Sequence, residues 1–509
     1  MKIGSIFSGI TIFYPVILMI GVTISLWIAP LVFTSDPDRI TSLPGFSGSL
    51  PSRMWSGFIP VAGKSKFLHY WFIESESSPS EDPILLWMQG GPGSSGMLGL
   101  LTEMGPFSTN DNSFNKKDNT SVPSIFENPW AWTKAANMIF FESPAAVGFS
   151  YCTDVCPQSN DTSTADENYE FVINFFKKFP TYRKNKFYIT GESYGGIYVP
   201  MLADRVNNDT SINFGGIAVG DGCTGIQTRG GCGIDYNYWY LKVLYGHGQI
   251  SASLAENLFA NCTAWLTGQP NTNSVECSDL YGEVNKQAGA FNIYNLYDEC
   301  YGKHDELLSM DTSFSMAHQQ TQIHQLASGV PSSVGGALND YPCGAQRAMQ
   351  AWLQNPLVKK ALHVDVPGVH REFSYLSTEN STFPIYHRLL ANKKRVLIYY
   401  GDTDVIVPYN GGEYWVNNMG LNIIEDWRSW SLHGGSRTGG HLIRFENDFT
   451  YLTVRGAGHM VPTFKPEAAF VMIMTFLNGK AYPRDKSDNT ASDKSIMDAL
   501  RRKAKIGEF

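Results

Sequence analysis

The sequence predicts an α/β protein built on a mainly parallel, buried sheet. Short apolar runs without polar alternation recur along the chain, which is typical of strands covered on both faces. Helical patterns lie between these runs, and alternation of strands with helices indicates a layered α/β fold. The chain has 509 residues, of which 43% are hydrophobic and 17% charged, so it can bury a sizeable core.

The predicted strands start with a hairpin and continue as single buried runs. Gly63-Lys64 separates the first two runs and marks the hairpin turn. Most later runs stop at a glycine, where the chain can turn sharply. The runs are Trp55–Val61, Phe67–Ile73, Ile84–Met88, Met138–Phe141, Phe187–Ile189, Ile217–Val219, Val396–Tyr400 and Tyr451–Val454.

Helices are predicted where apolar residues recur at helical spacing. One such pattern runs from Val172 to Phe179 and ends at Pro180. Pro466 opens a second helix that continues through Phe476. The segment Ile197–Val206 can also be helical, directly after a predicted strand.

The sequence divides into an N-terminal segment, a core, an insertion and a tail. Residues 1–35 are predicted to be a signal peptide or an N-terminal membrane anchor, because a positive start precedes a long uncharged apolar run. Residues 36–222 and 344–480 carry the predicted core. Residues 223–343 break the rhythm of strands and helices, so we expect an inserted cap or lid there, and residues 481–509 form a polar tail.

Cysteine usage predicts disulfides and passage through the secretory pathway. The eight cysteines include no CxxC pair and no zinc-finger spacing, so we expect no metal and no cofactor. A net charge of -8 without a basic face argues against nucleic acid as a partner. Glycosylation sequons, which fit export, begin at Asn119, Asn160, Asn208, Asn261 and Asn380.

The strongest local signal is a G-x-S-x-G motif at Gly191–Gly195. It follows a predicted strand and precedes a predicted helix, which is the context of the nucleophile elbow in α/β hydrolases. Ser193 is therefore the candidate nucleophile. The backbone N–H of Tyr194 and a second N–H from the loop Gly90–Gly93 are expected to form the oxyanion hole.

A serine nucleophile needs a histidine as base and an acid that orients this histidine. In α/β hydrolases the acid follows the serine in the chain, and the histidine follows the acid. Asp404 and His459 both lie just past a predicted buried strand, where sites in such sheets are built. Asp402 competes with Asp404, but its place at the strand end favours a role in the turn. His433 and His441 lie in Gly-rich loops and are expected at the surface.

Five ordered blocks resemble the serine carboxypeptidases, and the resemblance runs from about Ile40 to Gly479. It implies an α/β-hydrolase fold with Ser193, Asp404 and His459 as catalytic residues and the N–H groups of Gly91 and Tyr194 as the oxyanion hole. The blocks are Leu86–Ser95, Asn128–Trp132 continuing through Glu142–Tyr151, Gly191–Pro200, Gly401–Asp404 and Gly456–Pro462.

The resemblance also implies a group that binds the free carboxylate of the substrate, formed by Trp87, Gln89, Glu103 and Glu192. Two adjacent glutamates cannot both ionise cheaply, so one keeps a proton and can donate a hydrogen bond to the substrate carboxylate. Activity favoured at acidic pH follows. Gln89 departs from the usual asparagine and is one methylene longer, which puts the clamp geometry in doubt.

Disulfide pairing is predicted only in part. The resemblance pairs Cys277 with Cys300, while proximity favours Cys223 with Cys232. Further options are Cys152 with Cys156, or Cys262 with Cys343. Ser94 stands where relatives carry a half-cystine, so Cys343 lacks its usual partner.

The sequence thus predicts a serine carboxypeptidase that hydrolyses the last peptide bond through an acyl-enzyme. Its partners are the C-termini of peptides or proteins, with a membrane only if the N-terminal segment is retained, and it is a monomer or homodimer. An acyltransferase on the same scaffold is the nearest alternative. A non-catalytic protective or binding protein is the other, although that role would not need Ser193, Asp404 and His459 together.

Overall fold

The computed structural model describes residues 36–114, 122–269, 275–298, 300, 341, 343–432, 435 and 437–484. The chain divides into two units, Met1–Pro37 and Asp38–Phe509, and all that follows concerns the second. The predicted signal or anchor at 1–35 lies outside the described residues, as does nearly all of the predicted tail. In the described ranges, no helix combines the length and the apolar character needed to cross a membrane.

The centre of the fold is a mixed sheet that joins twelve of the described strands. Its order is β1-β2-β3-β7-β4-β10-β11-β13-β16-β15-β14, and β8 pairs with β3. Neighbouring strands from β7 to β16 are parallel, and those outside this stretch are antiparallel. The prediction of a mainly parallel core is therefore confirmed. The strands are β1 (Arg39–Ile40), β2 (Met54–Val61), β3 (Lys66–Ile73), β4 (Ile84–Met88), β5 (Phe107–Ser108), β6 (Phe126–Glu127), β7 (Asn137–Phe141), β8 (Tyr151–Cys152), β9 (Ser159–Asn160), β10 (Phe187–Glu192), β11 (Phe214–Gly220), β12 (Tyr375–Leu376), β13 (Arg395–Gly401), β14 (Ile423–Leu432), β15 (Arg437–Phe445) and β16 (Phe449–Val454).

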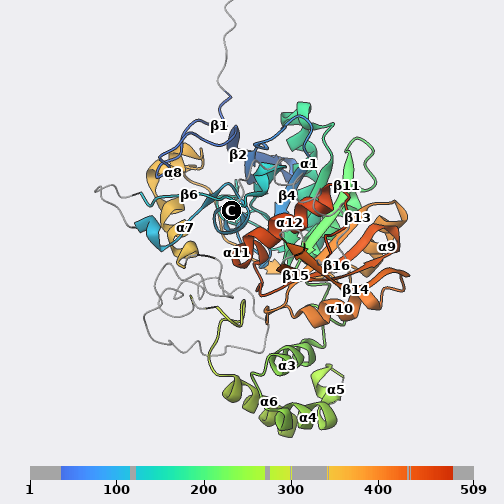
Figure 1. Ribbon diagram of the computed structural model, residues 1–509. Helices are drawn as coiled ribbons and strands as arrows, with labels where there is room; N and C mark the ends of the chain where they lie inside the picture. Colours follow the sequence, from blue (N-terminus) through green and yellow to red (C-terminus); the bar gives the residue numbers. More distant parts are fainter. Residues whose placement is uncertain are drawn as a thin grey trace, which may run out of the picture. The chain divides into compact units, whose positions relative to one another are not determined.

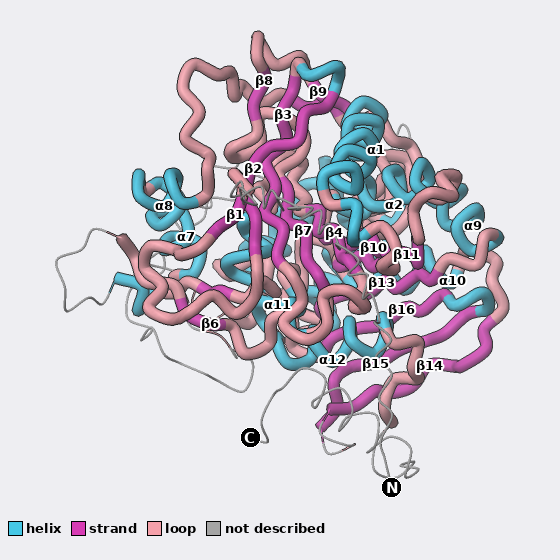
Figure 2. Tube along the Cα trace, turned by 90° about the horizontal axis from the view of Figure 1, so that it is seen from above, coloured by secondary structure: helices cyan, strands magenta, loops and turns pink. Residues whose placement is uncertain are grey.

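Helices cover both faces of this sheet (Figures 1 and 2). Helices α1, α2, α9 and α10 supply buried side chains to one face, and α7, α8, α11 and α12 to the other. The described α-helices are α1 (Asp161–Lys178), α2 (Gly195–Val206), α3 (Tyr236–Gly246), α4 (Ala252–Asn261), α5 (Thr263–Leu266), α6 (Val275–Ala288), α7 (Ala345–Gln354), α8 (Pro356–Ala361), α9 (Phe383–Ala391), α10 (Tyr409–Asn417), α11 (Val461–Phe464) and α12 (Pro466–Leu477).

The central strands are apolar on both sides because each face has its own core. Successive side chains of a strand point to opposite faces. In β4, Leu86 and Met88 join one hydrophobic cluster, while Leu85 and Trp87 join the other. This double burial explains why these strands appear in the sequence as continuous apolar runs.

Helix α1 is capped at its first turn and packs its apolar face against the sheet. The Asn160 side chain caps its first turn by accepting a hydrogen bond from the Ser163 backbone N–H at 2.9 Å. On its inner face the Phe175 ring packs edge-on against Phe72 of β3, with ring centroids 5.1 Å apart. Pro180 follows the helix and begins the next turn.

The outer hairpin of the sheet was not predicted. Strands β14 and β15 pair antiparallel at one edge. Ile423, Ile424 and Trp427 of β14 are exposed among charged neighbours, so the segment lacks the continuous apolar pattern of a central strand. An edge strand needs burial on fewer sides, and its sequence is correspondingly less distinctive.

Helices α3 to α6 gather beneath the sheet in the view of Figure 1 and share a hydrophobic cluster of their own. They lie in the chain between β11 and β13, within the segment 223–343 for which a cap or lid is predicted. Helix α3 contacts α10, and the rings of Trp239 and Tyr414 meet at 5.0 Å. The outer part of this segment, Gly302–Asp340, lies outside the described residues.

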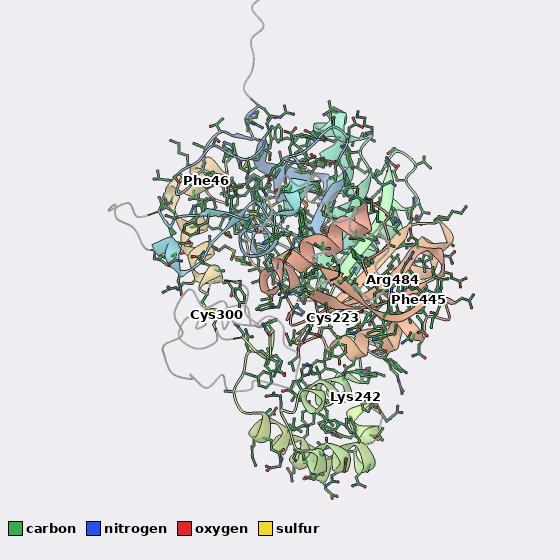
Figure 3. The ribbon with its side chains drawn as sticks, viewed as in Figure 1. Phe46, Cys223, Lys242, Cys300, Phe445 and Arg484 are labelled. Atoms are coloured by element: carbon green, nitrogen blue, oxygen red, sulfur yellow. A yellow bond between two sulfur atoms is a disulfide. The ribbon has the colours of Figure 1, made fainter. Side chains whose placement is uncertain are left out.

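Four disulfides join all eight cysteines, which fits the predicted secretory pathway (Figure 3 labels Cys223 and Cys300). The pairs Cys152–Cys156 and Cys223–Cys232 are confirmed. The expected pairs Cys277–Cys300 and Cys262–Cys343 are wrong, because α4 and α6 pack together and bring Cys262 next to Cys277. Cys343 pairs instead with Cys300.

The aromatic contact between α1 and the sheet yields a stability prediction. Replacing buried Phe175 by alanine removes its packing on Phe72 and leaves a cavity, which should cost about 3–5 kcal/mol of unfolding free energy. The midpoint of thermal unfolding, followed by intrinsic fluorescence, should fall clearly. The control is Lys177→Ala on the exposed face of the same helix, which should change stability by no more than about 0.5 kcal/mol. Equal shifts in the two variants would contradict the assigned packing.

Candidate active site

The neighbouring parallel strands β10, β11, β13 and β16 have their carboxyl ends on one side of the sheet, and the candidate residues follow three of these ends. Ser193 comes directly after β10, Asp404 three residues after β13, and His459 five residues after β16. Glu192 pairs with Gly220 of β11, Gly220 with Tyr399 of β13, and Gly401 of β13 with Val454 of β16. The hydrogen-bonded register therefore brings these distant parts of the chain to one edge, where sites of α/β sheets lie.

Ser193 occupies the sharp turn between β10 and α2. Its φ of +61° lies in the left-handed region, which a residue other than glycine rarely adopts. The turn is held by the Ser193 N–H, which donates to the Gly220 carbonyl at 2.9 Å. Gly196 is needed on the helix side, because a Cβ there would lie 2.1 Å from the Cys223 carbonyl oxygen.

The imidazole of His459 is paired with the carboxylate of Asp404. Their Nδ1 and Oδ2 atoms are 2.7 Å apart, and both side chains are buried. The Asp404 carboxylate also accepts the backbone N–H groups of Ile406 at 2.8 Å and Val407 at 3.2 Å, which fix its orientation. Such a carboxylate can hold a histidine in the tautomer whose Nε2 accepts a proton.

In the described chain, no hydrogen bond joins the Ser193 hydroxyl to the His459 ring. Such bonds are often long or misaligned in a free enzyme and tighten when substrate binds. The His459 backbone N–H donates to the Tyr294 carbonyl at 2.7 Å, so a residue of the segment 223–343 helps to hold the histidine.

The glycine-rich loop after β4 packs directly against the serine turn. A Cβ on Gly90 would lie 2.6 Å from both the Ser193 Cβ and the Tyr194 nitrogen, so only glycine permits this approach. Gly91 follows with a φ of +108°. The Tyr194 hydroxyl donates to the buried Asp161 carboxylate at 2.7 Å, which anchors the residue that follows Ser193.

The four residues expected to bind a carboxylate form one buried network. The Gln89 amide nitrogen lies 2.6 Å from Glu192 Oε1 and 3.4 Å from Glu103 Oε1, while its oxygen accepts the Trp87 indole N–H at 2.7 Å. The longer Gln89 side chain therefore reaches both glutamates. In the described chain, Glu103 Oε2 and Glu192 Oε2 have no hydrogen-bond partner, so each glutamate keeps one oxygen that can receive a ligand or a proton.

Burial makes this pair difficult to ionise. Desolvation raises the pKa of Glu103 to about 8, although the neighbouring Glu192 carboxyl and the Gln89 amide oppose the shift. Desolvation and then the adjacent charge of Glu103 raise the pKa of Glu192 well above its ordinary value. The pair therefore keeps at least one proton at acidic and neutral pH.

The competing residues take other roles. Asp402 accepts the Gly456 backbone N–H at 2.6 Å, which is the turn role expected from its position. His441 is exposed and stacks on Trp427, as expected for a surface histidine. His433 lies outside the described residues.

The sequence motifs did not single out Asp221. It follows β11, the strand between those that carry Ser193 and Asp404, and it is fully buried with a φ of +43°. An oxygen of Asp221, an oxygen of Asp404 and a nitrogen of His459 lie within 4.8 Å of one another. The signal was present in the sequence, since a Gly-Asp step ends a buried strand at both Asp221 and Asp402.

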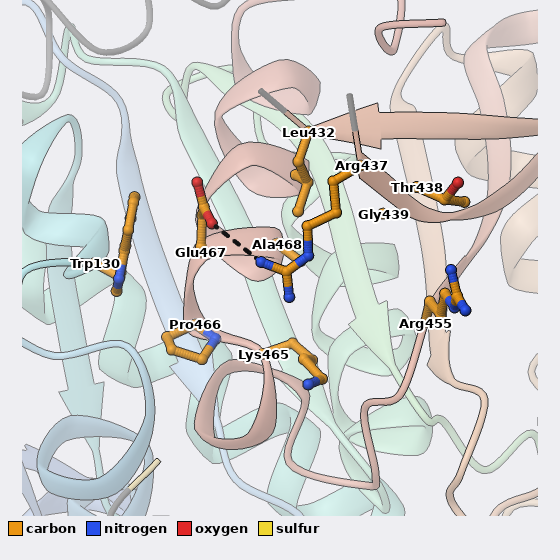
Figure 4. A pocket seen from close by; sticks show the side chains of 10 residues that line it. All are labelled: Trp130, Leu432, Arg437, Thr438, Gly439, Arg455, Lys465, Pro466, Glu467 and Ala468. Carbon is orange, nitrogen blue, oxygen red and sulfur yellow. Dashed lines mark ion pairs between the residues drawn. The ribbon is translucent and has the colours of Figure 1, made fainter. Parts of the chain in front are cut away.

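A separate hollow of about 210 Å³ lies where β15 meets the start of α12 (Figure 4). Arg437 there pairs with Glu467 at 3.9 Å. None of the predicted site residues lines it, so this hollow gives no support to the site at the strand ends.

Comparison with known proteins identifies a family. The family model described as serine carboxypeptidase matches residues 44–479. A serine carboxypeptidase-like protein 20 of Arabidopsis thaliana is 33% identical over 489 residues, covering 88% of this chain and 95% of the relative. The lysosomal protective protein of Mus musculus is 34% identical over 467 residues, with the same coverage of 88% and 95%.

A solved structure shares the fold. The crystal structure of a prohormone-processing carboxypeptidase from Saccharomyces cerevisiae matches with a TM-score of 0.61 at 17% identity, covering 87% of this chain and 95% of that one. This likeness and the sheet described above confirm the predicted α/β-hydrolase fold. The chain belongs to the serine carboxypeptidase family.

Proposed function

We propose that this serine carboxypeptidase cleaves with Ser193 as nucleophile, His459 as general base and Asp404 as the orienting acid. His459 removes the Ser193 proton as the serine oxygen attacks the carbonyl carbon of the last peptide bond. The C–N bond then breaks, the proton passes to the leaving amine, and an acyl-enzyme remains. Water, activated by the same histidine, releases the shortened peptide.

The backbone N–H groups of Gly91 and Tyr194 stabilise the oxyanion in this proposal. The support is the close packing of the glycine loop on the serine turn, which places Gly90 against the Tyr194 nitrogen. Donors fixed before the reaction need no reorganisation when negative charge develops on the carbonyl oxygen.

The observation that carries an exopeptidase role is the buried pair Glu103 and Glu192 beside the nucleophile. Glu192 precedes Ser193 in the chain, and Gln89 bridges the two glutamates. A pair that shares a proton can donate a hydrogen bond to the C-terminal carboxylate of a peptide, whereas a fully ionised pair repels it. The substrate is therefore a peptide or protein C-terminus, bound best at acidic pH.

Activity at acidic pH fits a vacuole or lysosome as the working compartment, with secretion as the alternative. The disulfides support passage through the secretory pathway. In this proposal residues 1–35 direct the chain there, as a cleaved signal or a retained anchor.

Removing the nucleophile should abolish turnover. Ser193→Ala is expected to lower kcat by at least about 10⁴-fold, because the remaining groups cannot form the acyl-enzyme. Release of the C-terminal amino acid from a blocked dipeptide measures the rate. Ser211→Ala, at an exposed serine outside the site, is the control and should keep wild-type activity. Substantial peptidase activity in Ser193→Ala would refute the assignment.

The glutamate pair predicts how substrate binding depends on pH. As pH rises through about 8, Glu103 ionises and the pair gains negative charge, so KM for a peptide with a free C-terminal carboxylate should rise by about tenfold or more. KM for the matching peptide ester, which has no carboxylate, should stay nearly constant over the same range. Steady-state kinetics with both substrates make the comparison. Parallel pH profiles of the two KM values would show that the pair does not bind the carboxylate.

A further inference from the structure

We infer that Asp221 is a positioning residue for the proposed triad: as a neutral acid, its carboxyl donates a hydrogen bond to the Asp404 carboxylate and fixes the group that orients His459. The inference rests on the proposed function and adds a residue to it. Asp221 does not touch the reacting atoms, so it acts only through Asp404.

The geometry leaves one oxygen of Asp221 available for this contact. Oδ1 accepts the Gly401 backbone N–H at 2.9 Å, and the Asp221 N–H donates to the Tyr399 carbonyl at 2.8 Å, which anchors the residue between β11 and β13. Oδ2 is buried, and no donor among the described residues reaches it. A buried polar oxygen without a partner is costly, and a proton on it would supply the missing hydrogen bond.

Asp221 and Asp404 are both buried, and one carboxyl oxygen of each lies within 4.8 Å of the other. Two carboxyls at this distance cannot both be ionised cheaply in a buried site. The Asp404 carboxylate receives three donors, from His459, Ile406 and Val407, and these favour its charged form. Asp221 receives one, from Gly401. The proton therefore resides on Asp221, whose carboxyl becomes the donor and Asp404 the acceptor.

The surroundings support a neutral Asp221. Burial, followed by the charge of Asp404, raises the pKa of the Asp221 carboxyl well above its ordinary value, although the Gly401 N–H opposes the shift. Among the described residues, the titratable groups around it include Glu192 at the end of β10, Tyr399 and Tyr400 of β13, Asp404 after β13, Tyr451 of β16 and His459 after β16.

The backbone offers a conservative test variant. A φ of +43° is tolerated best by glycine, asparagine and aspartate. In Asp221→Asn the amide oxygen can still accept the Gly401 N–H, while its NH₂ donates to Asp404 without a titrating proton. Asp221→Ala removes both contacts and leaves Asp404 without the donor.

The experiment follows kcat against pH with a blocked amino-acid ester, which has no carboxylate for the glutamate pair to bind. In the wild type, kcat should fall at alkaline pH, where Asp221 ionises and repels Asp404. Asp221→Asn should keep kcat within about threefold at acidic pH and lose this alkaline fall. Asp221→Ala should lower kcat by about 10- to 100-fold with KM changed by less than about threefold.

Two controls separate a positioning role from a fold defect. Asp235→Asn alters another buried aspartate that accepts a backbone N–H, that of Gly230 at 2.8 Å, and should leave the pH profile of kcat unchanged. Thermal unfolding identifies variants that do not fold. If Asp221→Ala does not fold, the pH profile of Asp221→Asn decides alone.

The outcomes distinguish this inference from the proposed function. A wild-type alkaline fall retained in Asp221→Asn would overturn the inference, as would wild-type kcat in folded Asp221→Ala. Either result leaves the triad standing if Ser193→Ala is inactive. Activity in Ser193→Ala would instead overturn the proposed function itself.

Discussion

The site depends on the parallel register of four strands, β10, β11, β13 and β16. Backbone hydrogen bonds between neighbours align their carboxyl ends, so residues more than 250 positions apart in the chain reach one edge of the sheet. Both faces of these strands are buried under helices, which keeps the edge rigid. The strained turn at Ser193 and the buried pair of Asp404 and His459 can persist because this frame holds them.

Charge at this edge is arranged in two adjacent carboxyl pairs. Glu103 and Glu192 lie next to the nucleophile, where Gln89 bridges them, and Asp221 and Asp404 lie next to His459. Each pair uses the same physics, because buried neighbouring acids favour one neutral and one charged member. In the proposed mechanism their roles differ: the first pair binds the tail of the substrate, and the second holds the base in place. In that proposal, acidic conditions suit both pairs.

The central strands could be predicted from the sequence, because strands buried on both faces have continuous apolar sequences. The hairpin of β14 and β15 was not predicted, since its exposed isoleucines and charged residues interrupt such a pattern. Cys262 and Cys277 could not be paired without knowing that α4 packs on α6.

The site residues were predicted only in part. The position of Asp221 directly after a buried strand is visible in the sequence. Its place near Asp404 and His459 depends on the order of strands in the sheet, which puts it between the strand ends that carry Ser193 and Asp404. The extra methylene of Gln89 suggested that the group expected to bind the substrate carboxylate is displaced. In the structure, the Gln89 amide contacts both Glu103 and Glu192.

The proposed mechanism requires Ser193 and His459 to meet in the working enzyme. A crystal structure of the protein after reaction with a fluorophosphonate would show whether they do, since the adduct imitates the tetrahedral intermediate. We expect phosphorus on the Ser193 oxygen, His459 Nε2 within about 3 Å of that oxygen, and a phosphoryl oxygen between the N–H groups of Gly91 and Tyr194. An adduct on another residue, or a His459 ring that stays out of reach of Ser193, would contradict it.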